Sequence, residues 1–374
     1  MSKKIVWFVM SVLVIALVAT GCAKPTVAPT AVPATEVPTE VAAEPTAEEA
    51  AEVEASPEAE AEASPEAPVV SDKELKTVSI QIDGAAVPYY APLYMAQEKG
   101  FFAEEGLNVE FYYAAAADIV KNVASGNVEF GFPNADAVVA ARAQDIPVKV
   151  VSTTYQEGLG AIIFGVDSGI KTPADLKGKK VGVTSHGSAN YFQLEAAMKS
   201  VGMTVDDVNV EIIGTGAILT ALTQGQVDAI VFSKLRTIEL NNQGYAAADI
   251  VSDQFLPSFG NVLISSDKLV ADDPATVDGF VKALNKGIEY VINNVEESVD
   301  YSIEKMAPTF AERRDVVVEI LNEVFVKTLW QSDYTKEHGI GASNVEKWQK
   351  LIDNSKEYGT IDKTFSASDL LYIK

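Results

Sequence analysis

The sequence contains few of the residues that build nucleophilic active sites and metal centres. It has one cysteine, Cys22, and two histidines, His186 and His338. A single cysteine excludes a disulfide within the chain. No HExxH, CxxC, GxSxG or phosphate-loop motif is present. We therefore expect no metal, no cofactor and no catalysis that depends on such groups.

Basic residues are also scarce. The chain has 29 Lys and Arg against 53 Asp and Glu, a net charge of −24. Residues 1–75 hold 13 of the acids and 4 of the bases, which leaves 40 and 25 for the remainder, or −15. A globular part this acidic argues against nucleic acid as a partner, and against direct binding of its surface to anionic lipid.

The N-terminus has the pattern of an export signal. Lys3 and Lys4 precede a largely apolar run over residues 5–19, and Thr20, Gly21 and Cys22 follow. The run is short for a membrane span. The pattern resembles a bacterial lipoprotein signal over residues 1–21, with Cys22 acylated as the first mature residue. The alternative is an ordinary signal peptide with a cysteine there by chance.

Residues 22–75 form a segment of different composition, in which Pro, Ala, Thr, Val and Glu alternate without a core-forming period. Such a segment cannot bury enough apolar surface to offset the entropy of ordering it. We expect a disordered stalk, extended where it is rich in proline and self-repelling where it is acidic.

The remaining 300 or so residues alternate between strand and helix patterns, which predicts a parallel α/β sheet. The pattern restarts near Thr172, and residues after about Asn261 are mostly helical. Strands are expected at 77–83, 109–113, 129–132, 148–154, 179–184, 210–213, 229–232, 249–251 and 261–266. Helices are expected at 91–99, 118–124, 135–143, 190–201, 218–223, 274–293, 296–305, 310–329 and 344–358.

Residues 119–132 and 218–231 repeat one design: an amphipathic helix, a glycine, then Val, an acid and a buried strand. Gly126 and Gly225 are predicted to take the left-handed conformation that ends each helix. Any helix–glycine–strand joint has this form, but together with the restart near Thr172 the repeat favours two lobes.

Three segments resemble one family. They are YAPLYMAQEKGFFAEEGLNVEF (90–111), IKTPADLKGKKVGV (170–183) and A-x-x-x-G-x-V-D-A (221–229). With the helical tail, they resemble the solute-binding proteins of ABC importers, in the family related to the thiamine-pyrimidine synthases. The resemblance covers residues 76–374. It implies a type II periplasmic-binding-protein fold, with lobe one at 76–165 plus 260–374 and lobe two at 168–258.

The family also implies partners: a small-molecule ligand closed between the lobes and an ABC permease in the membrane. With Cys22, it implies a monomer that is lipid-anchored on the extracytoplasmic face of the cell membrane. The related synthases use a site with cysteine and histidine, for which this chain has no cysteine beyond Cys22. A purely structural surface protein would not need the polar residues described next.

Ligands of open α/β sheets lie outside the carboxyl ends of the strands. Tyr89 and Tyr90 follow the first strand, where they can stack on a flat ligand or pack on the lobe. The other candidates at strand ends are Asn134, Tyr155, Ser185, His186, Ser188, Asn190 and Ser233. Asn134 is also a plausible helix cap.

Relatives in this family bind riboflavin, thiamine pyrimidine precursors, sulfonates or nitrate. An anion favours Lys or Arg in the cleft, and among the strand ends only that at Phe232 carries a base, Lys234. The sequence therefore favours a neutral heterocycle. Riboflavin is the first choice and a thiamine pyrimidine precursor the second.

The stalk interpretation gives the first prediction. A protein that begins at Lys76 should unfold at the same temperature as the mature chain and bind its ligand equally well, because the stalk has no apolar pattern that could pack on the lobes. Differential scanning calorimetry of both forms measures this. A drop of more than a few degrees on removal of the stalk contradicts the interpretation.

Overall fold

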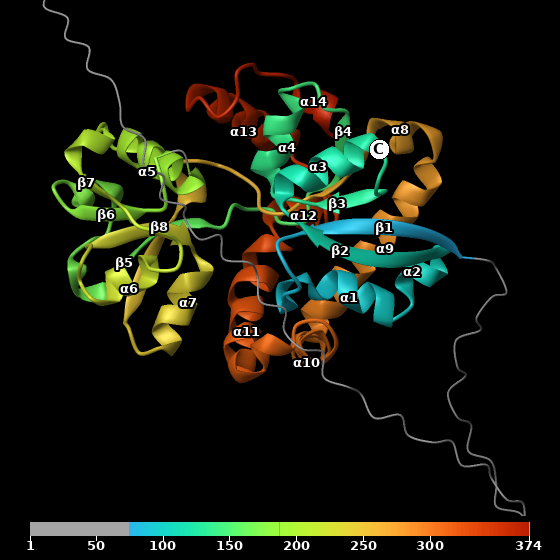
Figure 1. Cartoon of the computed structure of the whole chain (residues 1–374), viewed down its shortest axis with the longest axis horizontal. Coiled ribbons are helices and arrows are strands. Elements are labelled where there is room, and N and C mark those ends of the chain that lie inside the picture. Colours follow the sequence, from blue (N-terminus) through green and yellow to red (C-terminus); the bar gives the residue numbers. More distant parts are fainter. Residues whose placement is uncertain (1–74, 187, 374) are drawn as a thin grey trace, which may run out of the picture. The chain divides into compact units, whose positions relative to one another are not determined.

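A computed structural model describes residues 75–186 and 188–373 of the chain. The predicted signal, Cys22 and stalk up to residue 74 lie outside the described residues. Within them the chain forms two five-stranded sheets, each covered by helices (Figure 1). We call each sheet with its helices a lobe, and number the lobes by their order along the chain.

The sheet of lobe one has the order β2-β1-β3-β10-β4. Strands β2 and β3 both pair in parallel with β1, as predicted, but β10 runs antiparallel to β3 and β4. The predicted parallel sheet is therefore a mixed one, because β10 enters it on the return from lobe two. The strands are β1 (Lys76–Asp83), β2 (Leu107–Ala114), β3 (Phe130–Phe132), β4 (Val148–Ser152) and β10 (Leu263–Ser266).

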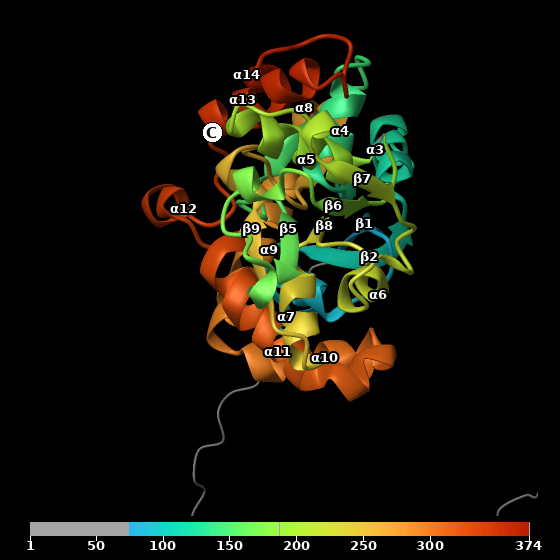
Figure 2. The same cartoon turned by 90° about the vertical axis from the view of Figure 1, so that its left-hand side faces the viewer.

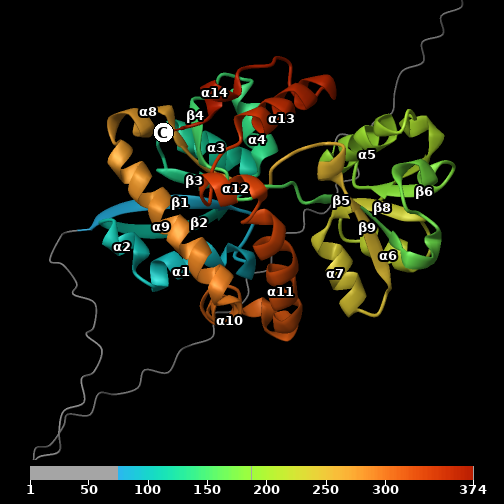
Figure 3. The ribbon, with the colours of Figure 1, turned by 180° about the vertical axis from the view of Figure 1, so that it is seen from behind.

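Helices cover both faces of this sheet. Val78, Ile80 and Ile82 alternate along β1 and point toward one of them, as the two-residue period of a strand requires. That face packs against α1 (Ala91–Glu98), α2 (Phe101–Glu104), α9 (Pro274–Asn293), α10 (Val295–Lys305), α11 (Arg314–Ile320) and a π-helical segment, η7 (Leu321–Leu329) (Figure 3). The other face packs against α3 (Ala116–Ser125), α4 (Ala135–Arg142), α13 (Val345–Glu357) and α14 (Ala367–Leu370).

The sheet of lobe two has the order β7-β6-β8-β5-β9 (Figure 2). One face packs against α5 (Ala189–Ser200), and the other against α6 (Ile218–Thr223) and α7 (Leu235–Asn242). The strands are β5 (Gly160–Gly165), β6 (Lys180–Val183), β7 (Asn209–Ile212), β8 (Ala229–Ser233) and β9 (Ala247–Val251).

The lobe boundary at residue 165 is also corrected. Residues 160–165 form β5, which pairs antiparallel with β8 and β9 of lobe two rather than with lobe one. Ala161 and Ile163 face α6, whereas Ile162 and Phe164 face α5, so both sides of this apolar run are buried. The chain therefore crosses between the sheets in residues 153–159, and it returns in residues 252–262.

Most other predicted elements lie where the sequence places them, including the glycine-ended helices. Gly126 has φ 76° and Gly225 φ 67°, which confirms the predicted left-handed stops. The predicted elements do not include β5, α7, α8 (Asp267–Asp272), α12 (Asp333–His338) and α14. The helix predicted over 310–329 is divided into a 3-10 turn, η6 (Pro308–Arg313), then α11 and η7. No helix among the described residues is both long and apolar enough for a membrane span.

The close contact between α1 and α9 gives a second prediction. A Cβ on Gly287 would lie 2.2 Å from the Pro92 carbonyl oxygen, which is backbone and cannot move aside. Gly287→Ala should therefore lower the free energy of unfolding by about 1–3 kcal/mol, despite the better helix propensity of alanine. Urea unfolding measures the change.

Gly279→Ala, two turns away on α9, is the control. Its Cβ would lie 3.2 Å from the Glu105 Cβ and 3.7 Å from the Glu105 carbonyl oxygen, so no backbone atom comes closer than an ordinary van der Waals contact. The stability should stay within about 1 kcal/mol of the parent. Equal losses of stability in Gly287→Ala and Gly279→Ala would show that the contact with the Pro92 carbonyl oxygen is not the cause.

Candidate ligand-binding site

The three predicted tyrosines lie together in lobe one. Tyr89 and Tyr90 form a 3-10 turn, η1 (Pro88–Tyr90), directly after the loop that follows β1. With Phe132 and Tyr155 they surround a small cavity of about 10 Å³. The rings of Tyr90 and Tyr155 each meet that of Phe132 edge-on, at 6.0 and 5.7 Å between centroids. This cavity is smaller than a ligand, and the tyrosine rings here pack on phenylalanines, chiefly Phe132 and Phe325.

The hydroxyl groups of these tyrosines differ in their partners. Tyr90 donates to the Asp83 carbonyl oxygen at 2.7 Å, and Tyr155 donates to the Tyr89 carbonyl oxygen at 3.3 Å. The Tyr89 hydroxyl is buried without a hydrogen-bond partner, while its ring stacks on Phe325 at 5.3 Å. Burial, with Glu239 nearby, raises the pKa of Tyr89 to about 12. The phenol therefore stays neutral and keeps a proton that it can donate.

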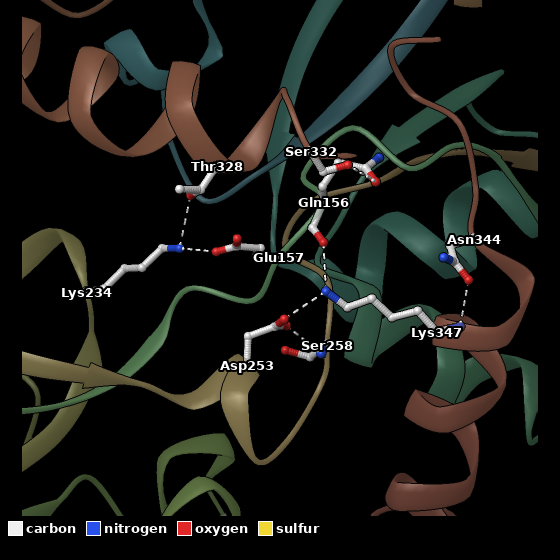
Figure 4. A network of polar contacts seen from close by, with 9 residues as sticks. All are labelled: Gln156, Glu157, Lys234, Asp253, Ser258, Thr328, Ser332, Asn344 and Lys347. Carbon is white, nitrogen blue, oxygen red and sulfur yellow. Dashed lines mark hydrogen bonds and ion pairs between the residues drawn. The ribbon is translucent and has the colours of Figure 1, made fainter. Parts of the chain in front are cut away.

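Lys234, the one base at a predicted strand end, is not available to an anion. It is 6% exposed, and its Nζ lies 2.8 Å from Glu157 Oε2 and 3.3 Å from Thr328 Oγ1 (Figure 4). Its charge is therefore already compensated by a carboxylate. The neighbouring Ser233 ends β8 opposite Gly160 and is half-buried.

A larger recess of about 290 Å³ lies where the two lobes meet. Lobe one contributes Asp136 and Ala137 from the first turn of α4, and lobe two contributes Ala189 and Phe192 from the first turn of α5 and Gln193 from its second. Ser258 of the second crossover and residues of α13 and the turn after it complete the lining. A recess of this size is near the lower limit for small-molecule sites.

Two predicted site residues begin the helices that border this recess. Asn134 caps α4, with its Oδ1 accepting from the Ala137 N–H at 2.9 Å. Ser188 caps α5: its Oγ accepts from the Tyr191 N–H at 3.2 Å and donates to the Ser185 carbonyl oxygen at 2.8 Å. Both helices therefore present the partial positive charge of their N-terminal turns to the recess.

The remaining predicted residues stay outside the recess lining. Ser185 and His186 are exposed, and the His186 ring meets that of Tyr191 at 5.2 Å between centroids. Asn190 is half-buried in the first turn of α5. The tyrosine cluster does not line the recess either. The structure thus places most of the predicted residues in two groups, one around Tyr89 in lobe one and one at the start of α5 in lobe two. Asn134 begins α4 and Ser233 ends β8, outside both groups.

Several residues that line the recess are not among the predicted site residues. Asp136, Phe192 and Gln193 follow predicted residues by two to four positions, so the strand-end rule comes close to them. Tyr358 follows the last residue of α13, a helix that no strand-end rule selects. Gln193 lies flat against β5, since a Cβ on Gly160 would meet its amide at 2.2 Å.

The charge and donor set of the recess exclude some ligand chemistry. Asp136 is the one charged residue among those that line it, and none of them is basic. Within residues 75–186 and 188–373, no three His, Cys, Asp or Glu side chains are grouped so that they could hold a metal ion. The recess therefore has no cationic side chain for an anion, and the N-terminal turns of α4 and α5 can meet the acceptor atoms of a ligand with apolar faces and polar edges.

Comparison with known proteins identifies relatives of both binding and catalytic function. The chain is 26% identical to the riboflavin-binding protein RibY of Chloroflexus aurantiacus, over 73% of this chain and 78% of that protein. It is 28% identical to a 4-amino-5-hydroxymethyl-2-methylpyrimidine phosphate synthase of Aspergillus parasiticus, over 75% and 82%. It is 24% identical to a formylaminopyrimidine-binding protein of Halalkalibacterium halodurans, over 80% and 90%.

Solved structures confirm the predicted fold. The periplasmic aliphatic sulphonate binding protein SsuA of Escherichia coli superposes with a TM-score of 0.62 at 15% identity, over 79% of this chain and 92% of that one. The architecture is therefore that of the periplasmic binding proteins. Residues 87–298, more than half of the chain, match the model of one family. The chain belongs to the NMT1/THI5-like family.

Proposed function

We propose that this protein is the solute-binding component of an ABC import system, which captures a small ligand between its lobes and delivers it to a permease. One observation carries the proposal: the recess is built from the first turns of α4 in lobe one and α5 in lobe two. A ligand held there touches both lobes and stabilises one arrangement of them. Two of the relatives named above are binding proteins.

Riboflavin is our first choice of ligand, with a thiamine pyrimidine precursor second. Phe192 and Tyr358 offer aromatic surface for a flat ring, and the recess lining has no basic residue. Lys234 is paired with Glu157, so the strand-end base expected for a sulfonate or nitrate is occupied. The names of the two binding relatives, one for riboflavin and one for a formylaminopyrimidine, agree with this order.

We propose binding rather than catalysis, although a synthase is among the relatives. His186 and His338 are both exposed, and neither lines the recess. Burial raises the pKa of Asp136 to about 6, so it is the one group of the recess lining that takes up a proton near neutral pH, and no histidine or cysteine lines the recess beside it.

We further propose that the protein works as a monomer at the extracytoplasmic face of the membrane. Cys22 would carry the lipid, and the acidic stalk would let the lobes reach the permease. These proposals rest on the sequence of residues 1–75 and on the family.

The recess gives a third prediction. Phe192→Ala and Tyr358→Ala should each weaken riboflavin binding by about 1–3 kcal/mol, because each removes an aromatic contact from a desolvated site. Quenching of flavin fluorescence measures the dissociation constants. Tyr112→Ala, which changes an exposed tyrosine of β2, is the matched control and should bind as the parent does.

Two results would contradict this proposal. Parent-like riboflavin binding in both recess variants excludes the recess as the site. A parent protein that binds an alkanesulfonate but neither riboflavin nor a pyrimidine shows that the ligand is an anion.

The unequal tyrosine hydroxyls give a fourth prediction. Tyr90→Phe should lower the free energy of unfolding by about 1 kcal/mol, because the Asp83 carbonyl oxygen loses its donor. Tyr89→Phe should leave stability unchanged or raise it, because the hydroxyl that it removes is buried without a partner. Thermal unfolding without ligand compares the two. A larger loss in Tyr89→Phe shows that this hydroxyl has a partner in solution.

A further inference from the structure

The two crossovers between the lobes lie against each other. The Tyr155 N–H donates to the Asn261 carbonyl oxygen at 3.0 Å. A Cβ on Gly158 would lie 2.0 Å from Ser258 Oγ, and one on Gly260 would lie 2.8 Å from the Tyr155 ring. Because the segments are in contact, a rotation of one lobe against the other must change both together.

One lysine of lobe one binds both crossovers. Lys347 Nζ donates to the Gln156 carbonyl oxygen of the first crossover at 2.9 Å and to Asp253 Oδ2 of the second at 2.9 Å (Figure 4). It also lies 4.9 Å from the centroid of the Phe259 ring. The two charged side chains are 21% and 22% exposed, so the pair is shielded from water and more directional than a surface pair.

The same carboxylate also holds the wall of the recess. Asp253 Oδ1 accepts from the Ser258 N–H at 2.9 Å, and Ser258 lines the recess (Figure 4). Asp253 lies in a 3-10 turn, η5 (Ser252–Gln254), at the lobe-two end of the second crossover. A single carboxylate therefore connects the recess wall with a cation from lobe one.

The helix that carries Lys347 is fixed to lobe one and to both crossovers. Trp348, Leu351 and Ile352 lie in the buried cluster of lobe one that includes α3 and α4. Trp348 also stacks on Phe259 of the second crossover at 4.7 Å and donates from Nε1 to Thr153 Oγ1 of the first at 2.9 Å. Asn344 caps the helix through the Lys347 N–H at 2.9 Å. The ammonium group is thus presented from a rigid support, which a positioning group requires.

A second lysine makes the corresponding contacts from lobe two. Lys234, from lobe two, reaches Glu157 of the first crossover and Thr328 of lobe one. The two lysines therefore cross the hinge from opposite lobes, and each meets a carboxylate that belongs to a crossover (Figure 4).

We propose that Lys347 and Asp253 form a positioning pair that holds the two crossovers together and, through Ser258, fixes the recess wall relative to lobe one. Because both residues lie close to the hinge, their ion pair stays formed while the lobes move. The ion pair thereby restricts the range of orientations that the lobes adopt relative to each other. This inference rests on the crossover geometry and does not depend on which solute is bound.

The test measures the distribution of distances between the lobes without ligand. Lys121→Cys on α3 and Lys171→Cys in lobe two carry spin labels in the full chain with Cys22→Ser, so that no other thiol is present. Double electron–electron resonance then compares Lys347→Met with Lys350→Met, which removes the same charge from an exposed position on the same helix. The methionine keeps the apolar stem of Lys347 against Phe259.

Lys347→Met should broaden the distribution, whereas Lys350→Met should not. Asp253→Asn, which keeps the size of the side chain, should broaden it as well, and the double variant no further than either single one. Lys347→Arg, which keeps the positive charge, should keep the width of the parent's distance distribution. The riboflavin dissociation constant should rise about threefold or more in Lys347→Met.

A parent-like distance distribution in both Lys347→Met and Asp253→Asn overturns the proposal. If Lys347→Met does not fold, as judged by its thermal unfolding, the isosteric Asp253→Asn decides alone. If the parent protein does not bind riboflavin, the proposed ligand is wrong. The distances between the spin labels then decide this inference by themselves.

Discussion

Two crossovers that touch each other are the constraint on which the rest of the molecule depends. Each sheet is completed by a strand that arrives through a crossover: β5 in lobe two and β10 in lobe one. Both strands run antiparallel to their neighbours, because the chain enters each sheet from the side of the other lobe. The recess exists only because this exchange places the first turns of α4 and α5 at a common border.

The acidic composition has a structural consequence at the centre of the molecule. The basic side chains near the crossovers are occupied: Lys234 by Glu157 and Lys347 by Asp253. Arg236 of α7 pairs with Glu239, a carboxylate that is 6% exposed. Partly buried charges need such partners, since water cannot solvate them there. These three basic groups are thus committed to structure, and the recess is lined by apolar and polar side chains, with Asp136 as its one charged group.

The family holds binding proteins and synthases on similar chains, so the fold alone does not separate them. The difference must lie in the residues of the site. In this chain the recess combines aromatic rings, amides and hydroxyls with one carboxylate. Such a set fits the proposed recognition of a heterocycle by stacking and hydrogen bonds.

The sequence by itself determined what depends on neighbours along the chain. The alternation of strands and helices, the stops at Gly126 and Gly225 and the caps at Asn134 and Ser188 all follow from local backbone preferences. The sequence also indicated the family and the two lobes.

Only the tertiary structure decided what depends on pairs distant in sequence. The β5 strand is an apolar run whose partners, β8 and β9, lie more than 60 residues further along the chain. The occupation of Lys234 by Glu157, and the contribution of Tyr358 to the recess, likewise join residues that no local pattern relates. Ion pairs and recess walls form between surfaces that folding brings together, and local propensity carries no information about those surfaces.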